Sequence, residues 1–350
     1  MYIVIAILIF GLLIATHELG HFLAAKAFSV RVSEFAVGMG PALIKKQKGE
    51  TLYALRVLPI GGYCAMEEDE ESAEPRAFSN QAWWKRFIIL AAGAAMNFLT
   101  GLIILMFIVP KSGLFITPKI TGFFDNCPYN NAQGLQTGDT FYSIDGHRVF
   151  LSSDLSLLLS RSKSENIDIV LIRDGEKVEL KDYRFVPVDY TLDGEKVTKI
   201  GIYMTDRETG FLADLKYSWD GSRDFVRLVW MGLSDLVTGG VGLKDLSGPV
   251  GIVGLINDVG ENSATKTDAV LNIAYLAALI AVNLAVMNLL PIPALDGGRL
   301  FFLVITALIE GVFRRKLNPK YEGYVHAAGF VLLLGLMAVV MVSDIYKLIA

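Results

Sequence analysis

Two histidines and a glutamate end the first apolar stretch of the sequence, in the segment ATHELGHFLA (15–24). Residues 1–15 carry no charged side chain. On a helix, His17 and His21 are four residues apart, so their rings share one face about 6 Å apart along the axis. Two imidazoles at that spacing can bind one zinc ion, with Glu18 beside the metal-bound water as a general base. The spacing therefore predicts half of a catalytic zinc site.

The alternative is a pair of buried histidines that bond to the backbone or to each other, with Glu18 as a partner. A carboxylate at membrane depth costs roughly 2.5 kcal/mol or more, so an apolar segment favours the metal site. A catalytic zinc site also needs a third protein ligand. The candidates are Asp296, Glu310 and His326. Asp296, followed by two glycines, could equally be a turn residue or a helix cap.

Composition indicates a membrane protein. The 350 residues are 53% hydrophobic and 19% charged, and the mean hydropathy is +0.46. A net charge of -4 argues against a nucleic-acid partner. Four apolar segments are long enough to span a bilayer, at about 1–27, 86–109, 269–290 and 325–349. The first lacks a basic n-region, so we expect a retained helix and not a signal peptide.

The basic residues predict the orientation. Lysine and arginine are frequent in the connections 28–85 and 291–324, which favours a cytoplasmic location for both. Four crossings then leave the long middle segment outside the cytoplasm, where domains translocate largely regardless of charge. Cys64 and Cys127 would lie on opposite sides of the membrane, so we expect no disulfide between them.

The middle segment reads as a small α+β domain followed by a linker. Residues 111–190 alternate short apolar runs with turn signals such as IDG and RDGEK, around the helical stretch SSDLSLLLSRS. The linker 191–245 contains an amphipathic pattern over 222–238, which predicts either an interfacial helix or a helix packed on the α+β domain. Earlier, 51–66 reads as two short extended runs, and irregular backbone near a membrane must be buried in protein or line a cavity.

HELGH in the first span and NLLPIPALDGG (288–298) after a later one resemble the site-2 protease family of intramembrane zinc metalloproteases, in its bacterial branch that carries a PDZ domain. Five further segments support the resemblance over nearly the whole chain: VGMGP (37–41), PIGGY (59–63), LAAGAAMNF (90–98), GLQTGDTFYSIDG (134–146) and LSGPVGI (246–252). The resemblance implies that His17, His21 and Asp296 bind Zn2+ and that Glu18 is the catalytic base. One departure is Ala94, where relatives often have proline.

The resemblance also implies how substrate is held. Asn288, Pro291 and Pro293 would position it near the metal, and 51–66, with Gly61, Gly62 and Tyr63, would be a membrane-associated β-hairpin that presents an edge to it. Substrates would be single-span membrane proteins, such as anti-sigma factors or signal-peptide remnants, cleaved in regulated intramembrane proteolysis. The PDZ-like domain would bind a peptide or exclude bulky substrates.

The sequence thus predicts an α-helical polytopic membrane protein of about four transmembrane helices, with an inserted extracytoplasmic PDZ-like α+β domain. Residues 1–110 and 246–350 would form the membrane domain in a bacterial cytoplasmic (inner) membrane, with the active site toward the cytoplasmic side. Two alternatives stay open. One is a membrane-anchored zinc protease with a water-facing site that uses Glu310. The other is a non-catalytic PDZ adaptor or metal transporter.

Overall fold

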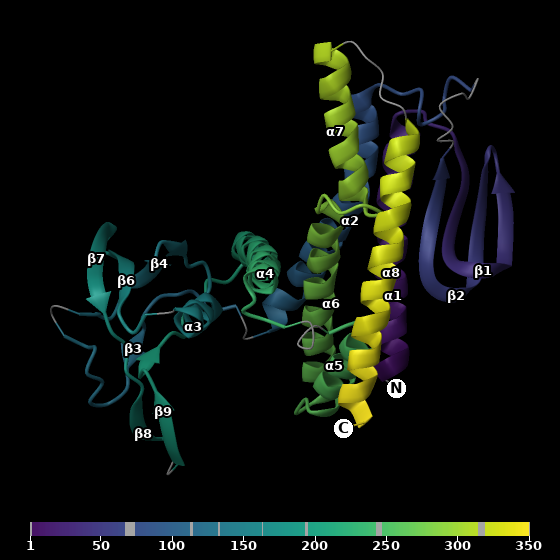
Figure 1. Ribbon diagram of the computed structural model, residues 1–350. Coiled ribbons are helices and arrows are strands. Elements are labelled where there is room, and N and C mark those ends of the chain that lie inside the picture. The colour runs from purple at the N-terminus through teal and green to yellow at the C-terminus, as the bar shows by residue number, and fades with distance from the viewer. Residues whose placement is uncertain are drawn as a thin grey trace. The chain divides into compact units, whose positions relative to one another are not determined.

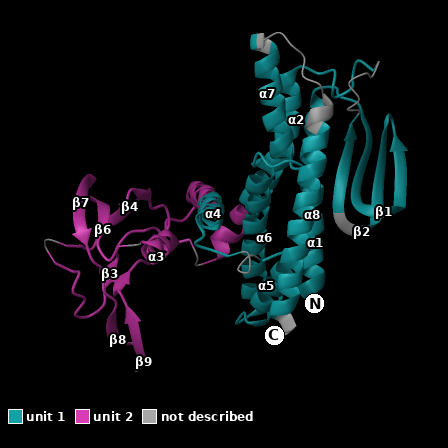
Figure 2. Cartoon of the chain, in the orientation of Figure 1, with its two compact units in different colours: residues 1–104, 225–350 teal, residues 105–224 magenta. Residues whose placement is uncertain are grey.

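The computed structural model describes residues 2–66, 74–112, 115–131, 134–162, 164–192, 195–242, 247–313 and 319–349. The chain divides into two compact units, one made of residues 1–104 and 225–350 and the other of residues 105–224 (Figure 2). The first unit contains both HELGH and LDGG, so it holds the candidate metal site.

Helices make up most of the first unit (Figure 1): α1 (Tyr2–Ala27), most of α2 (Trp83–Ile108), α5 (Pro249–Glu261), α6 (Lys266–Leu289), α7 (Asp296–Phe313) and α8 (Pro319–Ile349). Four helical segments of the described chain are long and apolar enough to cross a membrane: 2–27, 83–111, 266–289 and 323–347. The prediction of four candidate spanning helices is therefore confirmed. Their bounds differ from the predicted ones by a few residues at most ends.

Two helices were not predicted. The helix α7 fills much of the expected connection 291–324, so Asp296 opens a helix of its own and does not belong to α6. The helix α5, too short to span a bilayer, packs against both α1 and α6 around Leu13, Ile256 and Ile280. Its first turn is capped from far along the chain, because Asp344 of α8 accepts the N–H groups of Gly248 and Gly251 at 2.9 and 2.8 Å.

Small residues bring three spanning helices into close contact. A Cβ added at Gly20 of α1 would lie 2.3 Å from the carbonyl oxygen of Ala92 in α2. Gly101, further along α2, meets Ala278 and Val282 of α6 in the same way. In lipid no hydrophobic driving force brings helices together, because the acyl chains are as apolar as the side chains. Helices therefore associate through small residues that let their backbones pack closely. The result is a tight α1–α2–α6 group in which polar side chains of the three helices can meet.

The segment 51–66, expected to form a hairpin by itself, is one strand, β2 (Thr51–Met66), which pairs with β1 (Val32–Lys48) in a curled antiparallel hairpin that contacts α1 (Figure 1). Each strand folds back on itself through register shifts, so four segments pair in the order 62–66, 32–37, 52–55 and 44–48. Ala36, for example, is paired with both Tyr63 and Ala54. The segment 62–66 therefore forms one edge of this sheet.

The second unit is a small α+β unit. Its main sheet has the order β5 (His147–Arg148), β4 (Thr140–Ile144), β6 (Ile167–Arg173) and β7 (Glu176–Tyr183), accompanied by α3 (Ser152–Arg161). Two strand pairs complete it: β3 (Gly122–Phe123) with β10 (Ile202–Tyr203), and β8 (Val188–Leu192) with β9 (Glu195–Lys199). The buried ion pair between Asp139 and Arg173, 2.7 Å apart, fixes the turn before β4 against the end of β6.

The domain boundary expected at residue 190 falls inside this unit, because β10, at residues 202–203, pairs with β3, at residues 122–123. The segment taken as a linker therefore contributes strands to the α+β unit. The amphipathic pattern at 222–238 belongs to a longer helix, α4 (Phe211–Thr238), which begins earlier than expected. Cys64 and Cys127 are both free thiols.

Candidate metal centre

The two HELGH histidines meet the LDGG aspartate at one point of the first unit. Asp296 Oδ2 lies 3.1 Å from His17 Nε2 and 3.2 Å from His21 Nε2. The two Nε2 atoms are 3.3 Å apart. Three potential ligand atoms, from helices that are far apart in sequence, thus form a nearly equilateral triangle.

The contacts of His21 indicate which of its nitrogens is free to bind a cation. Its Nδ1 lies 2.8 Å from the carbonyl oxygen of Ile89, which can only accept, so Nδ1 carries the proton and donates it. In the neutral ring, Nε2 then presents a lone pair to Asp296 Oδ2. That carboxylate oxygen is buried and has no hydrogen-bond partner among the described residues. Two lone pairs that face each other at this distance repel, so a bound cation would stabilise the arrangement.

The size of the triangle fits zinc. Zinc bonds nitrogen and carboxylate oxygen at about 2.0–2.2 Å in tetrahedral geometry, which separates neighbouring ligand atoms by about 3.3 Å. The three observed separations, 3.1, 3.2 and 3.3 Å, match the edges of one tetrahedral face. Two imidazoles and one carboxylate also form the donor set of a catalytic site whose fourth position stays open for water.

Two asparagines surround the other nitrogen of His17. Asn97 Nδ2 and Asn288 Nδ2 each lie 3.4 Å from His17 Nδ1, and Asn97 also accepts the hydroxyl of Thr16. A half-turn of either amide brings its oxygen to Nδ1, which would then donate and leave Nε2 for a metal. Asn288 was expected near the metal. Asn97 was not assigned a role from the sequence, although an asparagine inside a spanning helix was the available signal.

Glu18 lies between the triangle and the edge of the curled sheet. A Cβ added at Gly62 would lie 3.2 Å from Glu18 Cγ and 3.5 Å from Ile14, so a larger residue here would press on the Glu18 side chain. The backbone of Cys64, two residues further, is near enough to the Glu18 carboxylate to stabilise its charged form. The sheet edge therefore lies directly beside the proposed general base.

Gly93 of α2 faces the two imidazoles. A Cβ there would lie 2.3 Å from His21 Nε2 and 2.7 Å from His17 Cε1. Any other residue would fill the space in which both rings turn toward Asp296. Ala94, the departure from the family pattern, is fully buried beside it. The glycine of the GAAMN segment thus has a steric reason to be there.

Asp296 is carried by a turn between α6 and α7. The N–H of Leu295 donates to the carbonyl of Ile292 at 3.2 Å, closing a β-turn with Pro293 and Ala294 at its centre. Ala294 has φ +76°, so the turn has the features of type II, whose third residue is ordinarily glycine. A left-handed alanine costs roughly 1–2 kcal/mol. The ligand therefore follows directly on a strained turn.

The two glycines after Asp296 allow α7 to begin against this turn. A Cβ at Gly297 would lie 2.2 Å from the carbonyl oxygen of Leu290, and one at Gly298 would lie 2.4 Å from that of Ile292. Leu295 accepts the N–H groups of Gly298 and Arg299 and so starts the helix. Asp296 stands in the first turn, where a negative charge suits the helix dipole. The ligand and the helix-start interpretations of Asp296 are thus compatible.

The other candidates have different surroundings. Glu310 is exposed near the end of α7, about 21 Å along that helix from Asp296, and is not in the triangle. His326 of α8 accepts the N–H of Ala294 at 2.9 Å, so its Nδ1 is engaged by the turn and not by a metal. Tyr63 bonds to Arg56 within the sheet.

The end of α1 that follows HELGH is tied to the sheet by charge. Lys26 lies 2.6 Å from Glu50 in the β1–β2 turn, and Arg76 reaches the same carboxylate at 2.8 Å. Arg76 and Lys26 hold the pKa of the Glu50 carboxyl at about 2, well below its ordinary value, because both stabilise its charged form.

Comparison with known proteins bears on this centre. The model of peptidase family M50 matches residues 5–336. A candidate zinc metalloprotease of Clostridium acetobutylicum is 37% identical over 346 residues, 98% of this chain and 97% of the relative. One of Clostridium perfringens is 35% identical over 348 residues, 99% and 98% of the two chains. The regulator of sigma-W protease RasP of Bacillus subtilis is 28% identical over 426 residues, 98% and 97% of the two chains.

Proposed function

This chain belongs to peptidase family M50, and from that premise we propose that it is an intramembrane zinc endopeptidase. It hydrolyses peptide bonds within or near the transmembrane segments of other membrane proteins, as a protease of regulated intramembrane proteolysis. One observation carries the proposal: the triangle of two Nε2 atoms and a buried carboxylate oxygen, with edges of 3.1–3.3 Å.

His17, His21 and Asp296 are the proposed zinc ligands. A zinc ion held there would supply an activated water and an electrophile that polarises the scissile carbonyl. The carbonyl of Ile89 holds the ring of His21, and the amides of Asn97 and Asn288 hold that of His17. These contacts fix the direction of both Nε2 lone pairs.

Glu18 is the proposed general base. Its carboxylate takes a proton from the attacking water and gives it to the leaving amine, so that the amine departs neutral. The close approach of Gly62 restricts where the side chain can lie. A positioned base has its proton-accepting oxygen in place before the substrate arrives.

The sheet edge at 62–66 is the proposed substrate platform. A helical substrate must unwind to expose a peptide bond, and in lipid each freed backbone group costs several kcal/mol unless it is paired again. An edge strand beside Glu18 can pair with the unwound segment by strand addition. The turn with Pro291 and Pro293, on the Asp296 side of the centre, would bound the same cleavage region.

The proposed substrates are single-span membrane proteins. A relative is named as the regulator of sigma-W protease, which supports anti-sigma factors as one class, with signal-peptide remnants as another. The lysines and arginines of 28–85 and 291–324 support a multi-pass arrangement in the bacterial cytoplasmic membrane, with the metal centre toward the cytoplasm and the α+β unit on the other side.

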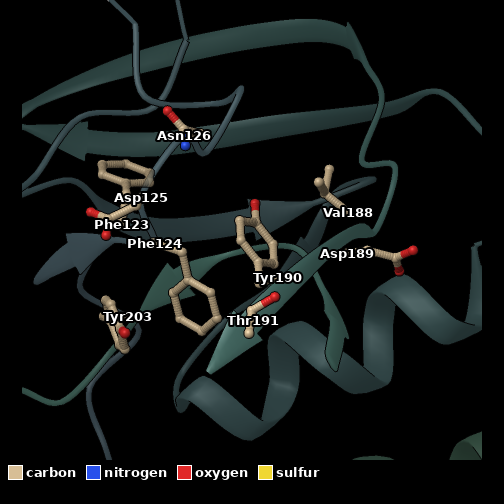
Figure 3. Close-up of a pocket in the computed structure, with 9 residues that line it drawn as sticks. All are labelled: Phe123, Phe124, Asp125, Asn126, Val188, Asp189, Tyr190, Thr191 and Tyr203. Atoms are coloured by element: carbon tan, nitrogen blue, oxygen red, sulfur yellow. The ribbon is translucent and has the colours of Figure 1, made fainter. Parts of the chain in front are cut away.

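The α+β unit is proposed to be a PDZ-like domain that binds a peptide. A pocket of about 370 Å3 lies beside β3 and β8 and is lined by aromatic rings of Phe124, Tyr190 and Tyr203 with the acidic residues Asp125 and Asp189 (Figure 3). Its rings and carboxylates suit a chain segment with apolar and basic side chains. If deleting the unit instead lets untrimmed substrates be cleaved, it acts as a size filter.

The decisive experiment is cleavage of a single-span substrate by the purified chain in liposomes. Wild type is expected to cleave it, a zinc chelator to stop it and added zinc to restore it. Glu18→Gln is expected to lose activity by at least about 100-fold while retaining bound zinc, since positioned general bases contribute 10²–10⁴-fold. Full activity in that variant would overturn the catalytic role and favour an adaptor or metal transporter.

Proline at Tyr63 tests the substrate platform. It removes the backbone N–H of Tyr63 and so disturbs the pairing of the 62–66 segment. Cleavage of a stable substrate helix should slow more than cleavage of a substrate frayed by glycines, because only the stable helix depends on renewed pairing. A control, Tyr63→Phe, keeps the backbone donor and removes the hydroxyl bonded to Arg56. Equal slowing of both substrates by the proline would count against the platform.

A further inference from the structure

His326, the residue at which α8 meets the Ile292–Leu295 turn, has a defined contact that the proposed chemistry does not use. Its Nδ1 accepts the N–H of Ala294 at 2.9 Å. In a type II turn the hydrogen bond between the first and last residues does not use the N–H of the third. Ala294 is that third residue, so its N–H points out of the turn. His326 satisfies this outward N–H.

Two further contacts hold the same end of α8 against the ligand-bearing segment. The ring of His326 packs on Phe302 of α7, with ring centroids 5.5 Å apart. A Cβ added at Gly329 would lie 2.3 Å from Cβ of Pro293, so α8 touches the turn one helical turn beyond His326. The turn is therefore held between α7 and α8.

We propose that His326 is a positioning residue for the third zinc ligand: by holding Ala294 in its left-handed conformation, it directs the Asp296 carboxylate at His17 and His21. The chain of contacts is short, since Ala294 is two residues before Asp296. Alanine disfavours φ +76°. Without the acceptor, the turn can relax to a negative φ, which rotates the peptide planes that lead to Asp296 and moves the carboxylate out of the triangle.

The inference rests on the proposed ligand set and extends it. It predicts that His326 affects zinc affinity and not only helix packing. Contacts that orient metal ligands typically contribute about 10- to 100-fold in metal affinity. A residue that only packs α8 against the bundle would change thermal stability and leave the affinity of the folded protein for zinc unchanged.

The test measures the zinc dissociation constant of the full-length chain in detergent, by competition with a chromophoric chelator. His326→Ala should weaken zinc binding by about 10-fold. His326→Asn should keep most of the affinity, because its Oδ1 stands where Nδ1 stood. His326→Gln, whose amide reaches past that position, should bind as weakly as the alanine variant. Equal zinc affinities of wild type, Asn and Gln variants would overturn the proposal, even where the alanine variant fails to fold.

A double-mutant cycle with Ala294→Gly separates turn positioning from packing. Glycine accepts φ > 0 at little cost, so the turn would depend less on His326. The loss of zinc affinity on His326→Ala should therefore be several-fold smaller in the Ala294→Gly background. An equal loss in both backgrounds would show that His326 does not act through the conformation of the turn.

Asp296→Ala distinguishes this inference from the proposed function. If that variant retains zinc with wild-type affinity, the ligand set itself is wrong. If it loses zinc while all His326 variants bind normally, the ligand set stands and only the positioning role of His326 falls.

Discussion

The two halves of the metal centre are built in different ways. His17 and His21 come from one regular helix, whose period alone sets their spacing. Asp296 follows a strained turn. The first residues of α7 pack against the backbone carbonyls of Leu290 and Ile292, and α8 contacts the turn near its start. Ligands on a helix need little outside help, whereas a ligand after a turn depends on several distant segments. The comparison predicts that the aspartate half is the more sensitive to substitution around it.

The largest effect is expected at the aspartate ligand itself. Asp296→Ala removes one of the three proposed ligands and should weaken zinc binding by more than about 100-fold, beyond the usual loss from contacts that only orient a ligand. The matched control is Glu310→Gln on the same helix, which should leave bound zinc and cleavage unchanged. Zinc content after dialysis measures both. Loss of zinc in the Glu310 variant alone would support the water-facing alternative.

A smaller loss is expected one step away from the ligand. Gly298→Ala brings a methyl group against the carbonyl of Ile292, and such overpacking typically costs about 1–3 kcal/mol, or roughly 10-fold in zinc affinity where the ligand moves. Gly335→Ala in α8 is the control, since its added Cβ meets nothing within 4 Å. Competition with a chelator compares the two. Equal affinities would mean that the turn tolerates displacement and that the two halves do not differ.

The smallest effect is expected at the end of α1. Glu50→Gln removes the charge that Lys26 and Arg76 share, an exposed interaction worth about 0.5 kcal/mol. Because the pKa of Glu50 is lowered to about 2, its contribution is present above pH 4.5 and is lost as pH falls toward 2. Thermal unfolding should separate wild type from the variant at pH 7 and not near pH 2. A tenfold loss of zinc affinity in the Glu50→Gln variant at pH 7 would show that the histidine half also depends on contacts from outside its helix.

The same difference explains what the sequence could predict. The histidine pair of HELGH could be predicted because the period of a helix fixes the distance between residues four apart. The four spanning helices could be predicted because a helix that crosses a bilayer needs about 20 apolar residues. Asp296 was one of three candidates until the family resemblance selected it. The residues next to Asp296 in the sequence do not predict that its side chain lies beside α1, because that depends on contacts between segments far apart in the chain.

Residues whose role depends on close packing could not be predicted from the sequence either. Gly93 matters because two imidazoles lie against it, and Gly62 because Glu18 does. From sequence alone, each is one glycine among many. The helix α7 was missed because its apolar run is interrupted by charge and shorter than a span, so the segment read as a connection.

The capping of α5 by Asp344 has a consequence for the order in which the protein is made. A ribosome completes HELGH within the first residues and LDGG well before the final helix. Until Asp344 has been synthesised, however, the first N–H groups of α5 lack their acceptor, and the turn at Ala294 lacks α8 as a support. A nascent chain therefore carries all three proposed ligands before the helix that packs on this turn has been made.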